Sequence, residues 1–223
     1  MTGTEKKAII ENAFAGIVIT AQSFNPSIFT ETWMYKNSVL SVDSLEGVRV
    51  FSPTIVQFQA KDVLVSVRPE RMDVHFKIHE IEGNFETQRN IASRTVELLP
   101  QTPYIALGLN FDFYVILPDG QDFLTYNRSL LGTGTYQLFT EFLDPNVRFG
   151  RYFSKDYGSA RLKLDIKPVI GAQNKKDMLY FSFNFHYDLD NIDLSERSAK
   201  LLAYMKEWDN LKNYSSKLVE LGI

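Results

Sequence analysis

The stretch YIALGLNFDFYVIL at positions 104–117 decides the fold, because apolar and polar side chains alternate along it. The odd positions from Ile105 to Val115 are all apolar, whereas the even positions include Asn110 and Asp112. Successive side chains of a β-strand point to opposite faces, so a period of two predicts a strand with one core face and one polar face. Such strands are typical of antiparallel sheets, which can leave one face open.

Three further stretches show the same alternation, and they cover residues 71–79, 161–167 and 178–189. Four segments predict helices, and they cover residues 26–37, 85–99, 121–131 and 194–220. The first follows Asn25-Pro26, and the third ends at Gly132, a residue common just after a helix. The last opens with the capping-box pair Asp193 and Glu196. At about 27 residues, it is long for a domain of this size.

Two pairs of short sequence matches indicate an internal repeat. MYKNSVL at 34–40 and TYNRSLL at 125–131 share Tyr, Ser and Leu at the same spacing. VSVRP at 65–69 and LDIKP at 164–168 follow in the same order. Each half of the chain reads as a strand, a helix, several short strands and a final helix. An ancient duplication explains this order, and the alternative is that an α+β chain repeats such patterns without common descent.

The sequence therefore predicts an α+β fold with a large antiparallel sheet and helices on one face. We expect two βαβₙα halves, residues 1–101 and 102–223, that share this sheet as a single domain. The element order resembles that of the TATA-binding-protein-like folds, which are also built from two such halves. The resemblance covers nearly the whole chain but no motif, and the basic character and wedging phenylalanine pairs of that family are not evident. It implies an architecture and no function.

Composition excludes several classes of protein. The chain has 223 residues, of which 44% are hydrophobic and 23% charged, as in globular proteins. A net charge of −3 provides no global basic field for nucleic acid. The lack of cysteine excludes disulfides and thiolate metal sites. Without a signal-peptide pattern or a run of roughly 18 apolar residues, we expect a cytoplasmic protein that does not span a membrane.

No catalytic, cofactor or metal motif is recognisable. His75 and His79 are four positions apart on a predicted strand, roughly 13 Å, which is too far for one metal ion. The acidic segment 188–193 lacks the glycine and the terminal glutamate of a calcium-binding loop. We therefore expect no metal and no cofactor.

The polar side of the predicted sheet is the first candidate site. Its residues are Tyr104, Asn110, Asp112, Tyr114, Tyr180, Asn184 and His186. The strand at 71–79 would add Arg71, Asp73, His75 and Lys77. Tyrosine beside Asn, Asp and His combines aromatic area with hydrogen-bonding groups, which suits recognition. The alternative is a solvated face without a role. If the site is catalytic, Asp112 and His186 form its acid–base pair.

The last predicted helix is the second candidate site. Its large side chains exceed what contact with one sheet obviously needs, and they are Tyr204, Trp208, Tyr214 and Leu218. One interpretation is a dimer or partner interface on this helix. The alternative is that the helix packs across the sheet like the helix at 85–99.

Three functions stay open at this point. The first is a non-enzymatic binding or assembly protein that works in a homo-oligomer or a multi-protein system. The second is a small-ligand receptor or an enzyme with a deep cavity on the polar face. The third is nucleic-acid binding by a saddle-like sheet, which predicts a continuous basic stripe. That stripe would contain Arg68, Arg71, Lys77, Arg161, Lys163 and Lys167.

Overall fold

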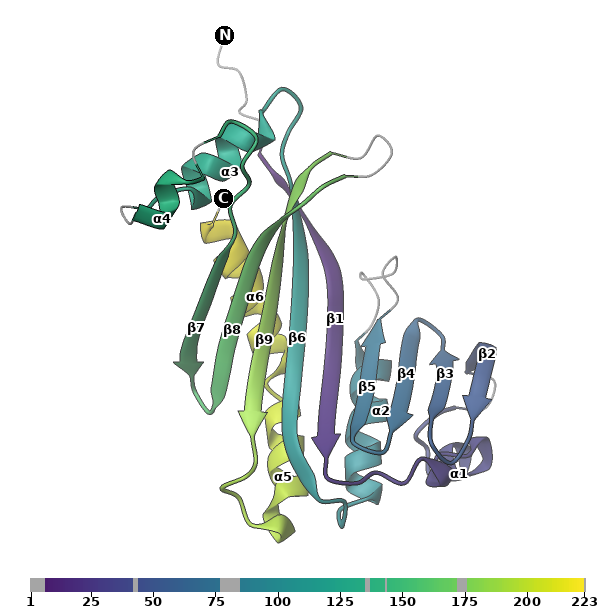
Figure 1. The fold of residues 1–223 in the computed structure, drawn as a ribbon. Coiled ribbons are helices and arrows are strands. Elements are labelled where there is room, and N and C mark those ends of the chain that lie inside the picture. The colour runs from purple at the N-terminus through teal and green to yellow at the C-terminus, as the bar shows by residue number, and fades with distance from the viewer. Residues whose placement is uncertain are drawn as a thin grey trace.

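The computed structural model describes residues 7–41, 44–76, 85–134, 137–142, 144–171 and 176–222. Within these residues the chain forms one antiparallel sheet of nine strands, with helices packed against one face (Figure 1). The predicted α+β fold class is thereby confirmed. None of the helices in these ranges combines the length and the apolar character that a membrane span needs.

The two halves of the chain supply five and four of these strands. The first half contains β1 (Ile9–Ala21), a 3₁₀ turn (Pro26–Ile28), α1 (Glu31–Lys36), β2 (Leu45–Phe51), β3 (Val56–Ala60), β4 (Val63–Arg68), β5 (Arg71–Phe76) and α2 (Glu86–Leu98). The second half contains β6 (Tyr104–Ile116), α3 (Phe123–Leu131), α4 (Gln137–Thr140), β7 (Arg151–Tyr157), β8 (Ala160–Val169), β9 (Met178–Asp188), α5 (Leu194–Met205) and α6 (Trp208–Leu221).

The two 13-residue strands β1 and β6 lie side by side at the centre of the sheet, whose order is β2-β3-β4-β5-β1-β6-β9-β8-β7. Outward from this pair, each half continues with its last strand and then runs backwards along the chain. The first half has one strand more than the second, and a repeated order of elements in the two halves is not confirmed. A duplication with its boundary near residue 101 therefore stays a prediction.

The core lies between the sheet and the helices α2, α5 and α6, which cover one face (Figure 1). Ile17 of β1 and Leu109 of β6 project into it and are fully buried. The Trp208 ring at the start of α6 packs on Phe111, with ring centroids 4.6 Å apart. Alternation along the strands thus produces an apolar layer, and burial of that layer is the main driving force for this packing.

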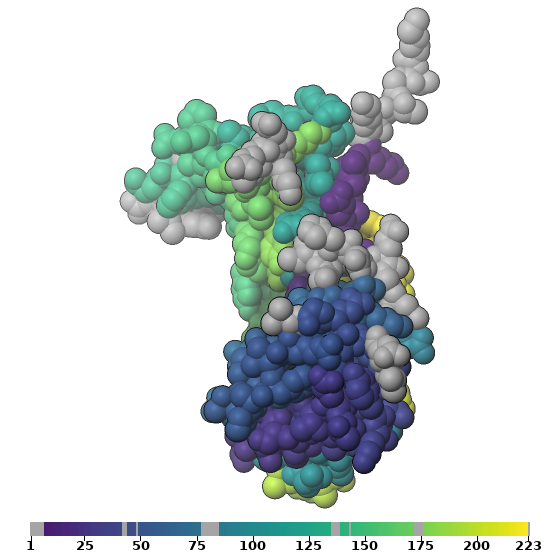
Figure 2. Space-filling model, turned by 90° about the vertical axis from the view of Figure 1, so that its right-hand side faces the viewer, coloured from purple at the N-terminus to yellow at the C-terminus, as the bar shows by residue number. Residues whose placement is uncertain are grey.

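The other side of the sheet, here called the open face, is not covered by these helices. Figure 2 shows the molecule from the side, with the open face on the left of the view. The outline is hollowed there, between α3 and α4 at one end and the first-half strands at the other.

Helix 26–37 is divided in the structure. Asn25 caps the 3₁₀ turn, since its side chain accepts a hydrogen bond from the Ser27 N–H. Thr30 then caps α1 by accepting from the Trp33 N–H. The second cap stops the chain from continuing as one helix, because a cap residue has extended backbone angles. Helix α4 was not predicted at all.

The last helix is also divided, at Lys206 and Glu207. The N–H groups of these residues donate to carbonyls only three residues back, those of Ala203 and Tyr204. This tighter turn interrupts the α-helical hydrogen bonding, so the single helix 194–220 that we expected is the pair α5 and α6.

Gln88 of α2 joins this helix to two strands of the sheet. Its side chain is fully buried, and its Nε2 donates to the carbonyls of Ala15 on β1, at 3.1 Å, and Val74 on β5, at 2.6 Å. The paired register of β1 and β5 ends close by, at Gly16 and His75. The glutamine therefore bridges the two strands where their pairing stops.

We expect Gln88→Met to lower the free energy of unfolding by about 1–3 kcal/mol, because buried carbonyls lose their donor while the side-chain length is kept. Urea unfolding followed by circular dichroism measures the change. Asn90→Ala, at an exposed position of α2, is the control and should change the free energy by less than about 0.5 kcal/mol. Equal stability of Gln88→Met and the wild type would contradict the bridging role.

Candidate functional site

A hollow of about 450 Å³ lies on the open face over the central strands. We call it the polar hollow. It is lined by residues of β1, β5, β6 and β9, among them Asn110, Asp112, Asn184 and His186. This volume is within the range of small-molecule sites, roughly 300–1,000 Å³.

Two glycines line the polar hollow. Gly16 lies beneath the Phe14 ring, and a Cβ atom at Gly16 would come within 2.6 Å of that ring. A Cβ atom at Gly108 would lie 3.3 Å from Nδ2 of Asn184. Neither glycine has a positive φ angle, so these positions need space rather than an unusual backbone. A side chain at Gly108 would occupy part of the polar hollow, whereas one at Gly16 would displace the Phe14 ring.

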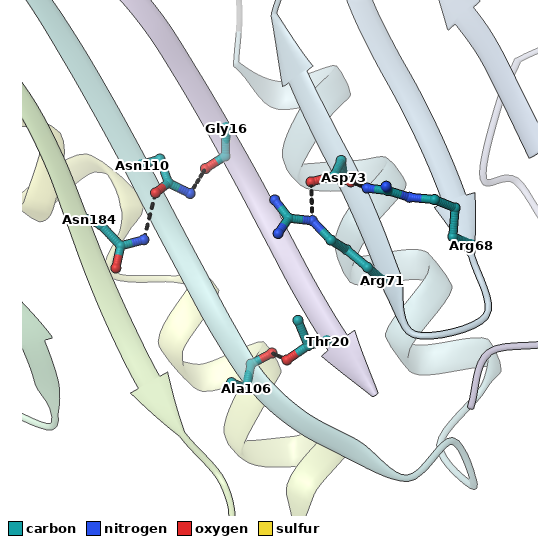
Figure 3. Close-up of polar contacts among 8 residues, drawn as sticks. All are labelled: Gly16, Thr20, Arg68, Arg71, Asp73, Ala106, Asn110 and Asn184. Atoms are coloured by element: carbon teal, nitrogen blue, oxygen red, sulfur yellow. Dashed lines mark hydrogen bonds and ion pairs between the residues drawn. The ribbon is translucent and has the colours of Figure 1, made fainter. Parts of the chain in front are cut away.

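An amide pair crosses from β9 to β1 (Figure 3). Nδ2 of Asn184 donates to Oδ1 of Asn110 at 2.6 Å, and Nδ2 of Asn110 reaches the carbonyl of Gly16 at 3.5 Å. The Asn184 oxygen points away from Asn110 in Figure 3. It can therefore accept a hydrogen bond from a bound group, and each amide nitrogen has a second hydrogen to donate.

Asp112 is a nearly buried carboxylate, with 7% of its surface exposed. The hydroxyls of Tyr180 and Ser182, on the neighbouring strand β9, donate to its two oxygens. Burial raises the pKa of Asp112, although these donors and nearby Lys167 act in the opposite direction. Burial and the hydrogen bond to Asp112 also raise the pKa of Tyr180, which keeps its hydroxyl protonated as a donor.

The first-half side of the polar hollow is formed by β5. Asp73 accepts from Nη2 of Arg68 at 2.8 Å and from Nε of Arg71 at 2.7 Å (Figure 3). His75 is next to it, with its ring 5.5 Å from the Phe14 ring. Burial lowers the pKa of His75 more than Asp73 raises it, so the imidazole is neutral at neutral pH.

Most of the predicted polar face is where the sequence places it. Asn110, Asp112, Asn184 and His186 line the polar hollow. The rings of Tyr114 and Tyr180 are tilted by 45° against each other, with centroids 5.4 Å apart, two register pairs beyond Asp112. Whether any of them binds a ligand stays a prediction. Lys77 and His79 lie outside the described residues.

The placement of Tyr104 on the polar face is wrong. Its side chain is fully buried in the core, and its hydroxyl donates to the carbonyl of Leu99 at 3.1 Å. The register of β1 and β6 shifts here. Thr20 pairs with Ala106, but the next residue, Ala21, pairs with Tyr104, so β6 has one extra residue between the two pairs. A bulge of this kind adds one residue to a strand and reverses the side to which earlier residues point.

The strand β1 supplies lining residues that the sequence did not reveal: Phe14, Gly16, Ile17, Val18 and Thr20. Its sequence AFAGIVITA is apolar or small at nearly every position, so alternation is hidden. A central strand with apolar residues on both faces gives no period of two, and this is why the sequence did not show which residues of the strand face the polar hollow.

The structure does not bring Asp112 and His186 together as an acid–base pair. Asp112 is opposite Ser182, whereas His186 is opposite Gly108, four residues further along β6. This separation is roughly 13 Å along the strand. In the described part of the chain, no cluster of three His, Asp or Glu side chains could hold a metal ion.

The predicted basic stripe is interrupted by acidic partners. Asp73 pairs with Arg68 and Arg71, Asp156 pairs with Arg161 at 2.9 Å, and Asp165 pairs with Lys167 at 3.4 Å. Charges of both signs therefore alternate across the open face, and they do not form the uniform field that a nucleic-acid backbone needs.

The candidate residues of the last helix have different surroundings. Trp208 is fully buried in the core, so its assignment to an exposed interface is wrong. Tyr204 stacks on Tyr187 of β9, with ring centroids 4.2 Å apart. Tyr214 packs in the same way on a tyrosine of β7, at 4.4 Å. Leu218 lines a second, apolar hollow near the end of α6. An interface role for the three partly exposed residues stays a prediction.

We expect Asp112→Asn to change how stability depends on pH. The pKa of Asp112 is raised in the folded state above its ordinary value of 3.8. The wild type therefore has its full contribution from this group below that value and loses it as pH rises through the folded pKa, whereas the variant does not titrate there.

The free energy of unfolding of the wild type minus that of Asp112→Asn should thus fall in urea titrations as the pH rises above 3.8, the ordinary pKa of this group. Ser182→Ala removes one donor to the carboxylate, so the folded-state pKa of Asp112 should rise further. The loss of stability with rising pH should therefore be larger in Ser182→Ala than in the wild type. If the free energies of unfolding of the wild type and of Asp112→Asn changed with pH in parallel, the pKa of the Asp112 carboxyl would not be raised in the folded state.

A scan of the chain against protein-family models found no match, and a search of curated proteins found no significant match either.

Proposed function

We propose that this chain is a non-enzymatic binding protein and that a small polar ligand occupies the polar hollow. The observation that carries the proposal is the combination of a floor that has no side chain at Gly108 with amide groups at Asn110 and Asn184. An open sheet face without a role would have no need for a depression at its centre. Amides that can both donate and accept suit an uncharged ligand with groups of both kinds.

The charges around the polar hollow support an uncharged ligand as well. On the β5 side, the carboxylate of Asp73 is neutralised by two arginines, and His75 is neutral. On the β9 side, Asp112 is held by two hydroxyls and is nearly buried. An anionic ligand would find no unpaired arginine or lysine among the lining residues, and a cationic ligand would find the Asp112 oxygens already bonded to two hydroxyls.

The separation of Asp112 and His186 favours binding over catalysis. General acid–base catalysis needs a group within hydrogen-bond reach of the proton that it moves. These two groups can contact opposite ends of one ligand, but they cannot exchange a proton directly. We propose a cytoplasmic location, which the lack of cysteine supports. Self-association remains part of the expectation from the sequence.

The test is a thermal-shift screen with a panel of amino acids, nucleosides and monosaccharides. A ligand at about 100 times its Kd should raise Tm by about 5–10 °C. Gly108→Val fills the centre of the floor and should abolish the shift. Asn184→Ala should weaken binding by roughly 3- to 10-fold, because one or two hydrogen bonds are lost.

Gln57→Ala is the matched control, since Gln57 is exposed on β3 and does not line the polar hollow. It should retain the full shift. A ligand that stabilises wild type and Gly108→Val equally would place the site elsewhere on the molecule. Turnover of a panel compound that disappears in Asp112→Ala would replace the proposal by an enzymatic function.

A further inference from the structure

A second hollow, of about 500 Å³, lies on the helix side of the sheet and is lined by residues of β7 and β8. We call it the apolar hollow. Its lining is dominated by apolar side chains, including Leu130, Phe153, Leu164, Ile166, Leu218 and Leu221. It is formed by α3, the edge of the sheet and the end of α6, and it shares no lining residue with the polar hollow.

Part of this apolar surface is exposed to solvent. Phe153 is 48% exposed and Leu221 is 82% exposed, although both line a concave surface. Exposed apolar area costs free energy in proportion to its size, so covering it with an apolar group is favourable. Contiguous exposed apolar surface of this kind marks a site of interaction.

Two cations flank Phe153 on the same side of β7. Arg151 contacts the carbonyls of Leu131 and Thr133, at 3.3 Å and 3.1 Å, and the Thr133 hydroxyl. Nζ of Lys155 donates to the Tyr214 hydroxyl at 2.7 Å. None of these acceptors is a carboxylate, and neither cation forms an ion pair within the described ranges of the chain.

These cations differ from the basic residues of the open face, most of which pair with an aspartate. An arginine and a lysine without carboxylates, beside an apolar surface, fit a ligand with an anionic head and an apolar body. Nε and Nη2 of Arg151 already donate to oxygens of Leu131 and Thr133, so its Nη1 group remains to donate to a carboxylate, and the Lys155 ammonium group provides a second charge.

We propose that the apolar hollow binds a single-chain amphipathic anion, of the fatty-acid class, with its alkyl chain on the leucines and its head group at Arg151 or Lys155. The volume is in the range of small-molecule sites. The chain would cover Phe153 and Leu221, and the head group would supply the missing counter-charge.

A second copy of the chain fits this surface less well. Strand β7 is one of the two edge strands of the sheet, so it could pair with β7 of another copy. Antiparallel pairing would then bring Arg151 and Lys155 of both copies to one side of the joined sheet. Four cations without carboxylates would repel one another across the contact.

The test measures binding of octanoate, decanoate and dodecanoate to the full chain by isothermal titration calorimetry, below their micelle concentrations. Affinity should increase about fourfold for each added methylene, because each one buries further apolar area. Decanol has the same chain as decanoate without the charge, and it should bind at least tenfold more weakly.

Lys155→Gln and Arg151→Gln should each weaken decanoate and leave decanol unchanged, whereas Leu218→Gln should weaken both. Arg161→Gln, on the open face, is the matched control and should alter neither. Circular dichroism confirms that each variant is folded. Since Arg151 also contacts α3, Lys155→Gln decides the outcome if Arg151→Gln unfolds.

Four results would overturn the proposal. The first is no saturable binding of dodecanoate, and the second is decanoate binding that Lys155→Gln and Leu218→Gln leave intact. The third is a wild-type dimer in sedimentation experiments that Leu221→Lys converts to a monomer, if decanoate binds only to that monomeric variant. Co-sedimentation with phosphatidylglycerol vesicles, without binding of free dodecanoate, would assign the surface to a membrane instead and would also refute a soluble ligand.

Discussion

The antiparallel pairing of β1 with β6 is the interaction on which the rest of the structure depends. It runs from Ile9 opposite Ile116 to Ala21 opposite Tyr104, and every other strand is added outward from this pair. Because β1 belongs to the first half and β6 to the second, neither half has a complete sheet without the other. The same pair forms the floor of the polar hollow, so the fold and the candidate site rest on one register.

The sheet meets different physical demands on its two faces. On the helix side, residues such as Ile17 and Phe111 are fully buried and need close apolar packing. On the open face, polar groups can be partly buried only if they are hydrogen-bonded. The pairing of Asp112 with two hydroxyls and of Asn184 with Asn110 meets this condition across β6 and β9. Polar residues at the centre of this sheet are thus retained because their hydrogen bonds are formed.

The sequence predicts local features well and long-range register poorly. Alternation identified β6, β8 and β9 and most lining residues on β6 and β9, because those strands have chemically different faces. It failed at Tyr104, where a bulge reverses the alternation, and at β1, where both faces are apolar. Trp208 lies on the apolar stripe of its helix, and the sequence does not show whether that stripe packs against the sheet or is exposed. The sequence alone therefore could not assign Trp208 to the core. The contact of Asp112 with Tyr180 depends on the pairing of strands 68 residues apart, which no local pattern encodes.

Strand β9 shows how tightly the two hollows constrain one register. Phe181 lines the apolar hollow, and the next residue, Ser182, lines the polar one. A slip of one residue against β6 or β8 would move phenylalanines to the open face and Asn184 into the apolar core. Both hollows would be lost together, along with the donors to Asp112. The register of β9 is therefore specified from both sides of the sheet, by apolar packing on one and by hydrogen bonding on the other.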